Sequence, residues 1–76
     1  MNYDLAMMAL ERMARAPMSL RVEGGEVVIE GEAASFKELA RLCLLLGGTQ
    51  TTNEEFELAP GVHVTRESLK LRLVIR

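Results

Sequence analysis

Hydrophobic residues in the first fifteen positions recur with the spacing of one face of a helix. Residues three and four apart form this face: Tyr3, Ala6, Met7, Leu10, Met13 and Ala14. Pro17 follows shortly afterwards, and a proline ring cannot continue a helix. We therefore predict a helix over Asn2–Arg15 whose apolar face packs on the core.

The pattern changes to period-two alternation from Leu20 to Ile29, which is typical of strands. Gly24-Gly25 stands at the centre of this segment, and glycines suit a two-residue hairpin turn because both central residues need positive φ. Such a turn pairs Leu20 with Ile29 and Val22 with Val27, so four apolar side chains share one face. The other face then carries Arg21, Glu23, Glu26, Val28 and Glu30.

A second helix is predicted over residues 35–48. Ser35 and Glu38 stand in the relation of a capping box, and Gly47 can supply a left-handed stop. The spacing of the apolar residues predicts one face that docks on a sheet: Phe36, Leu39, Ala40, Cys43 and Leu46.

Two further alternating segments, Glu55–Leu58 and Lys70–Ile75, are predicted strands. Val62–Val64 either extends a strand or begins a short crossover. The element order is therefore helix, strand, strand, helix, strand, strand. It predicts an α+β two-layer sandwich with a mainly antiparallel four-stranded sheet and the helices packed on it. At 76 residues the chain is expected to be a single domain, 1–76.

Composition narrows the classes of partner and the cellular setting. A net charge of −2 creates no general attraction for nucleic acid or anionic lipid. The longest apolar stretch, Leu42–Leu46, is far shorter than the roughly 20 residues of a membrane span. Cys43, the single cysteine, is predicted to be a small buried hydrophobe, and the lack of a disulfide framework favours a reducing compartment. We expect a cytoplasmic protein that binds neither nucleic acid nor membrane.

The residues with metal-ligand chemistry that cluster in the sequence are Glu54, Glu55, Glu57 and His63. Strand alternation turns Glu55 and Glu57 outward, where Lys70 and Arg72 of the last strand can pair with them. No serine or cysteine stands in a recognisable nucleophile motif, although Ser68, His63 and a carboxylate could be drawn as a triad. We therefore expect no catalytic residue, no metal site and no cofactor.

Two leucines and the methionines suggest an association surface. Leu44 and Leu45 extend the apolar surface of the second helix beyond the face that one sheet can cover. All five methionines lie in the first eighteen residues, and Met8, like Leu5, falls outside or beside the core face of its helix. An exposed apolar patch on so small a protein favours association, so we predict a homodimer with Leu44, Leu45 and Met8 or Leu5 at the interface.

From Ile29 onward the chain resembles small α+β immunity proteins of bacterial polymorphic toxin systems. The resemblance rests on a strand ending near Glu30-Gly31, a leucine-rich helix, the Pro60-Gly61 turn, and a Glu67-Ser68-Leu69-x-Leu71 segment before the last strand. That group carries His-x-His-Leu in its third strand, where this chain has Glu55-Phe56-Glu57-Leu58. The resemblance implies a protein that blocks a toxin-like partner.

The predicted function is a non-catalytic protein-binding module, immunity-protein-like, that acts by occluding its partner. The alternative is a small dimeric regulatory or ligand-sensing α+β domain, which a pocket lined by Tyr3, Phe36 and Phe56 would favour. The candidate partner-binding residues are Met8, Leu44, Leu45, Glu55, Glu57 and Arg72.

Overall fold

A computed structural model of the chain describes residues 3–48 and 54–75. The elements occur in the predicted order: α1 Tyr3–Arg15, β1 Ser19–Glu23, β2 Glu26–Glu30, α2 Ala33–Gly47, β3 Glu55–Leu58 and β4 Leu71–Val74. The order of helices and strands is therefore confirmed. Residues 62–64 belong to no named strand; they lie in a turn that ends in isolated bridges at Val64.

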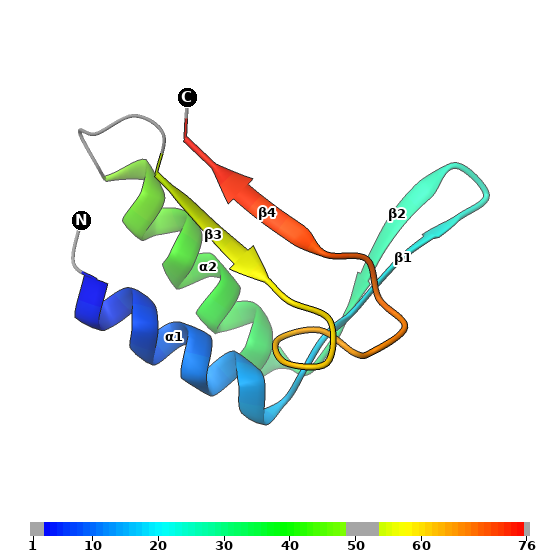
Figure 1. Cartoon of the computed structure of the whole chain (residues 1–76), viewed down its shortest axis with the longest axis horizontal. Coiled ribbons are helices and arrows are strands. Elements are labelled where there is room, and N and C mark those ends of the chain that lie inside the picture. The colour runs from blue at the N-terminus through cyan, green and yellow to red at the C-terminus, as the bar shows by residue number, and fades with distance from the viewer. Residues whose placement is uncertain (1–2, 49–53, 76) are drawn as a thin grey trace.

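The prediction of one four-stranded sheet is wrong. Within the described residues β1 pairs with β2 and β3 pairs with β4, and these antiparallel pairs form two separate sheets. The protein is α+β, but only β3–β4 lies along the helices. The β1–β2 hairpin extends away from this body (Figure 1).

The two sheets stay apart because a loop occupies the edge of β1 that a third strand would need. The Thr65 N–H donates to the Met18 carbonyl at 2.7 Å, and the Leu69 N–H donates to the Leu20 carbonyl at 3.0 Å. The Leu20 N–H in turn donates to the Ser68 hydroxyl at 2.9 Å. The β3–β4 connection therefore satisfies the base of β1, and β4 itself does not reach it.

The core lies between the helices and the inner face of β3–β4. Phe56 faces Leu73 and Leu58 faces Leu71 across the strand pair, so the predicted alternation places these residues on the helix side. The buried apolar residues are Ala6, Ala9, Met13, Met18, Leu20, Leu42, Leu46, Phe56, Leu58 and Val64. Burial of this cluster supplies the main favourable term in folding.

The predicted core face of α1 is correct only in part. Ala6 and Met13 are buried, and Leu10 packs against the core. Tyr3 and Met7 are more than half exposed, while Ala9 takes a buried place that the prediction did not give it. The face is rotated because α1 packs on α2 as well as on the sheet, and small alanines allow the helices to approach.

The predicted core face of α2 is rotated further. Its buried residues are Ser35, Glu38, Leu42 and Leu46, whereas Phe36, Ala40 and Cys43 are exposed. Leu39 and Leu45 pack partly against the core. The prediction treated a sheet as the only surface for this helix, but α2 also contacts α1, so its buried stripe is set by two neighbours. Cys43 is thus not the buried hydrophobe that was expected.

Ser35 and Glu38 are buried helical residues and do not form the predicted capping box. The helix begins at Ala33, and Glu32 is its N-cap without a side-chain cap bond. The Ser35 hydroxyl donates instead to the Ala16 carbonyl at 2.7 Å, which joins α2 to the end of α1. Gly47 is the last helical residue and does not take positive φ, so the predicted left-handed stop is also wrong.

Candidate functional site

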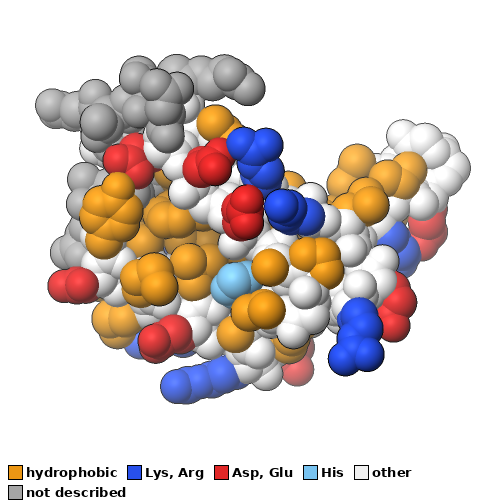
Figure 2. Space-filling view, in the orientation of Figure 1, with side chains coloured by type: hydrophobic (Ala, Val, Ile, Leu, Met, Phe, Trp, Pro, Cys, Tyr) orange, Lys and Arg blue, Asp and Glu red, His pale blue; other side chains and the backbone are white. Residues whose placement is uncertain are grey.

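The β1–β2 hairpin presents an apolar face that the rest of the described chain leaves uncovered. Its register is the predicted one, with Leu20 opposite Ile29 and Val22 opposite Val27. Gly24 and Gly25 both take positive φ, as the two-residue turn requires. Leu20 is buried at the base, but Val22 is 58% exposed and Val27 is 68% exposed. Figure 2 shows hydrophobic side chains gathered along one side of the projecting hairpin.

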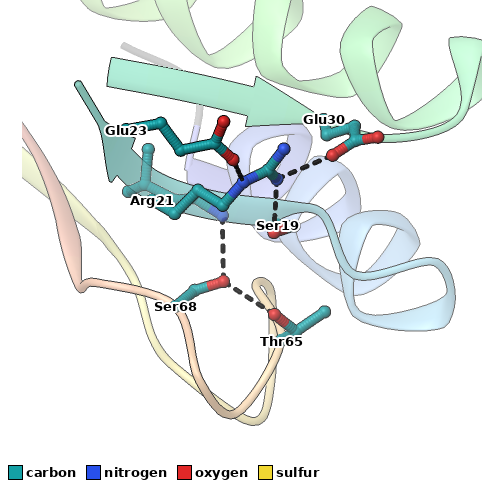
Figure 3. Close-up of polar contacts among 7 residues, drawn as sticks. Ser19, Arg21, Glu23, Glu30, Thr65 and Ser68 are labelled. Carbon is teal, nitrogen blue, oxygen red and sulfur yellow. Dashed lines mark hydrogen bonds and ion pairs between the residues drawn. The ribbon is translucent and has the colours of Figure 1, made fainter. Parts of the chain in front are cut away.

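The opposite face of the hairpin is an organised charged surface centred on Arg21. Its guanidinium contacts Glu23, donates to Glu30 at 2.6 Å, and reaches the Ser19 hydroxyl at 3.3 Å (Figure 3). The hydrogen bond to Glu23, followed by the one to Glu30, raises the pKa of Arg21. This arginine bridges two carboxylates of the hairpin, whereas Glu26 at the turn forms no ion pair with another described residue. The charged face is therefore acidic overall.

The base of the hairpin is held by the β3–β4 connection. The Ser68 hydroxyl accepts from the Leu20 N–H and lies 2.7 Å from the Thr65 hydroxyl (Figure 3). His63 has a different partner, since its Nδ1 accepts from the Ala59 N–H at 3.1 Å. Burial lowers the pKa of His63 below its usual 6.5. Ser68 and His63 therefore each accept a hydrogen bond from a backbone N–H. No hydrogen bond between the two side chains is seen among the described residues.

An open cavity of about 490 Å³ lies beside the hairpin base, lined by Ala16, Pro17, Ser19, Glu30–Glu32 and Thr65. The three aromatic residues proposed to line a sensing pocket do not line this cavity. Phe56 is buried in the core, Phe36 is exposed on α2, and the Tyr3 hydroxyl donates to the Glu54 carboxylate at 2.7 Å. That hydrogen bond raises the pKa of Tyr3.

The outer face of α2 is a second apolar surface. Leu44 is 76% exposed, and Phe36 is 40% exposed. Exposed small residues lie between them and on either side of them along the helix: Ala33, Ala40, Cys43 and Gly47. Lys37 and Arg41 are exposed on the same helix, whereas its only acidic residue, Glu38, is buried beside Arg12 and Arg41. We call Ala33, Phe36, Ala40, Leu44 and Gly47 the outer stripe of α2.

The predicted association residues occupy different environments. Leu44 is largely exposed on the outer stripe, but Leu45 packs partly against the core. Met8 is exposed on α1. Leu45 is therefore poorly placed to join Leu44 and Met8 in one exposed patch, because helical rotation turns it toward the core.

The outer face of β3–β4 carries the predicted ion pairs. Arg72 donates to Glu55 at 2.7 Å, and the Lys70 ammonium lies 3.5 Å from Glu57. The hydrogen bond to Glu55 is the main cause that raises the pKa of Arg72. Within residues 3–48 and 54–75, no group of three or more acidic, histidine or cysteine side chains is placed to hold a metal ion.

Comparison of the chain with protein-family models, curated proteins and solved structures finds no match. In the described part of the chain, neither helix is long and apolar enough to cross a membrane. The uncovered hairpin face and the outer stripe of α2 are therefore the features from which a function can be argued. Of the sequence candidates, only Leu44 belongs to them.

Proposed function

We propose that this chain is a non-catalytic protein-binding module that acts by covering a surface of its partner. The proposal rests on the projecting β1–β2 hairpin, whose side chains Val22, Val27 and Ile29 are exposed together on one face. A hairpin standing alone is marginally stable in water and gains from a partner that covers its apolar face. Contiguous exposed apolar surface commonly marks an interaction site.

The charges around this face support recognition without chemistry. The carboxylates of the hairpin lie on the face opposite the valines and at the turn, so negative charge lies behind the apolar face and at its tip. In protein interfaces, apolar area of this kind supplies affinity, while nearby charge steers the encounter and fixes the orientation. The favoured partner surface is thus apolar with basic residues nearby.

The resemblance to immunity proteins adds a mode of action to this proposal. A small protein that carries a protruding binding element can block a partner by steric occlusion. A cytoplasmic setting and a homodimeric state, with Leu44 exposed for association, belong to the same proposal.

A matched pair of valine variants tests the proposed function. Val22→Thr/Val27→Thr keeps the β-branched shape of the hairpin but places hydroxyl groups on its apolar face. Val62→Thr makes the same change at an exposed valine in the turn after β3. Both variants and the wild type are used to capture proteins from cells that express the chain naturally, and each captured protein is purified and titrated calorimetrically.

We expect a partner that binds the wild type and Val62→Thr with equal affinity and binds the hairpin variant at least tenfold more weakly. A partner that binds all three proteins equally would show that the hairpin is not the binding element.

A further inference from the structure

We infer that the first occupant of the hairpin face is a second copy of this chain. In this arrangement, which rests on the proposed role of the hairpin in protein binding, the hairpin of each protomer lies on the outer stripe of α2 of the other. The dimer therefore contains two identical hairpin-on-helix contacts. The hairpin face and the outer stripe of α2 are then buried in a single assembly.

Charge and coverage together select this pairing over two simpler ones. The exposed charges of α2 are the basic Lys37 and Arg41, and the hairpin carries three glutamates against one arginine. A helix-on-helix dimer would bring the basic residues of both copies together, and a hairpin-on-hairpin dimer would leave the outer stripe of α2 uncovered. Only the hairpin-on-helix contact covers both the hairpin face and the outer stripe, and it sets an acidic hairpin beside the basic residues of α2.

Two of these charges are available to pair between copies. Glu26 and Lys37 are exposed, and neither forms an ion pair with another described residue of its own chain. Arg41, by contrast, lies 3.5 Å from the buried Glu38. Glu26 and Lys37 are thus the charges that can be exchanged without disturbing the fold.

The two surfaces also match in shape and length. A five-residue strand extends about 17 Å, and the outer stripe from Ala33 to Gly47 extends about 21 Å along its helix. Ala40 between Phe36 and Leu44 leaves room for a two-stranded ribbon to approach the helix axis, as do Ala33 and Gly47 at the two ends of the stripe. The hairpin valines can then pack between the phenylalanine and the leucine.

Two-fold symmetry closes the assembly. The hairpin leads into α2 through Gly31 and Glu32, so both surfaces belong to neighbouring parts of one protomer. A two-fold axis can therefore place the two reciprocal contacts side by side. An isologous dimer of this kind buries every copy of both surfaces and leaves none to continue into a filament.

Sedimentation between about 5 and 500 µM tests the arrangement with three variants. Leu44→Glu alters only the outer stripe, Val22→Thr/Val27→Thr alters only the hairpin, and Met7→Glu is a matched control at an exposed apolar position of α1. We expect a dimer for the wild type and for Met7→Glu, and a dissociation constant at least tenfold higher for each of the other two variants. Circular dichroism checks that every variant is folded before its association is compared.

The single variants separate the competing arrangements. A helix-on-helix dimer would survive the hairpin substitutions, and a hairpin-on-hairpin dimer would survive Leu44→Glu. Either result, or a wild type that stays monomeric at 500 µM, overturns the inference. A monomeric wild type whose hairpin still binds another protein would leave the proposed function standing. A wild-type dimer for which no other protein binds through the hairpin would support the inferred dimer and contradict the proposed binding of a separate partner.

A charge exchange provides the sharpest arm of the test. Glu26→Lys and Lys37→Glu should each weaken self-association several-fold, because each creates like charges at both contacts of the dimer. The double variant Glu26→Lys/Lys37→Glu should recover wild-type affinity, and an equimolar mixture of the two single variants should form the heterodimer in preference to either homodimer. Equal weakening in the double variant and in the mixture would overturn the pairing of these two surfaces.

Discussion

The two antiparallel strand pairs of this protein, β1–β2 and β3–β4, have the same local pattern and opposite environments. Both alternate with period two, and both pair apolar residues across an antiparallel register. In β3–β4 the inward side chains Phe56 and Leu58 are buried, whereas in β1–β2 the corresponding Val22 and Val27 are mostly exposed. Alternation therefore determines which side chains share a face, but it does not determine whether anything covers that face.

The difference arises from how much surface the helices offer. Two short helices pack on each other and have room for one strand pair, and β3–β4 occupies it (Figure 1). The β1–β2 hairpin reaches the core only through its base, at Met18 and Leu20. The loop from Thr65 to Leu69 then satisfies backbone groups at the base of β1, so no further strand of the described chain pairs with β1 there.

Truncation of one residue in each of the two strand pairs gives the largest expected difference between them. Leu58→Ala removes a fully buried side chain and should lower the free energy of unfolding by about 2 to 5 kcal/mol, because it leaves a cavity. Val27→Ala removes an exposed side chain and should change it by about 0.5 kcal/mol or less. Urea denaturation at low micromolar concentration measures both. Equal losses would show that the hairpin face is covered within the monomer.

The junction between the hairpin and the body provides the second test. A Cβ at Gly31 would lie 2.6 Å from Cγ of the buried Met18, so Gly31→Ala forces that side chain to move and should cost about 1 to 3 kcal/mol. Gly47→Ala meets no atom within 4 Å at the end of α2 and should stabilise the protein by about 0.5 to 1 kcal/mol. Thermal unfolding should shift in opposite directions. A neutral Gly31→Ala would mean that the hairpin can change its angle freely.

The sequence predicts local structure well and the environment of each face poorly. The hairpin register follows from the Gly24-Gly25 turn, since a two-residue loop permits only one pairing. The Glu55–Arg72 pair follows from alternation on two adjacent strands. The rotation of α2 could not be predicted, because it depends on contact with α1 and on the Ser35 bond to Ala16, which are remote in sequence.

The candidate site was missed for the same reason. The alternation around Val22 and Val27 is typical of core positions. Their own segment does not show whether a helix or a second sheet covers them. A signal was present in Leu44, which was correctly predicted to be exposed because a helix with apolar residues on two sides cannot bury both. Counting the faces that need cover against the layers that can supply it would have extended the same argument to the hairpin.

Substitutions at Ser35 distinguish its hydrogen bond to Ala16 from a helix-capping role, because both roles stabilise the fold. Ser35→Ala should lower the free energy of unfolding by about 1 to 2 kcal/mol, because the Ala16 carbonyl loses a buried donor. A helix-capping role would give a similar value, so Ser35→Asp is the informative companion. An aspartate is as good a cap as serine, but at this buried position it would bring an unpaired carboxylate and destabilise more than alanine does. Urea midpoints that place aspartate near wild type would restore the capping explanation.

Substitution of His63, in the turn at the base of the hairpin, should have a smaller effect, which is a change in how the free energy of unfolding depends on pH. Burial lowers its pKa in the folded protein below 6.5, and its neutral Nδ1 accepts from the Ala59 N–H. The unfolded chain therefore binds a proton more readily, so this contribution to stability is present above pH 6.5 and is lost as the pH falls below it toward the lower folded-state pKa. His63→Asn keeps an acceptor for Ala59 and has no charge to titrate. The free energy of unfolding should consequently decline more between pH 7 and pH 5 in the wild type than in the variant, with the carboxylates contributing equally to both. Parallel profiles would show that His63 is as well solvated in the fold as in the unfolded chain, and that the turn holding the hairpin base is looser than its hydrogen bonds indicate.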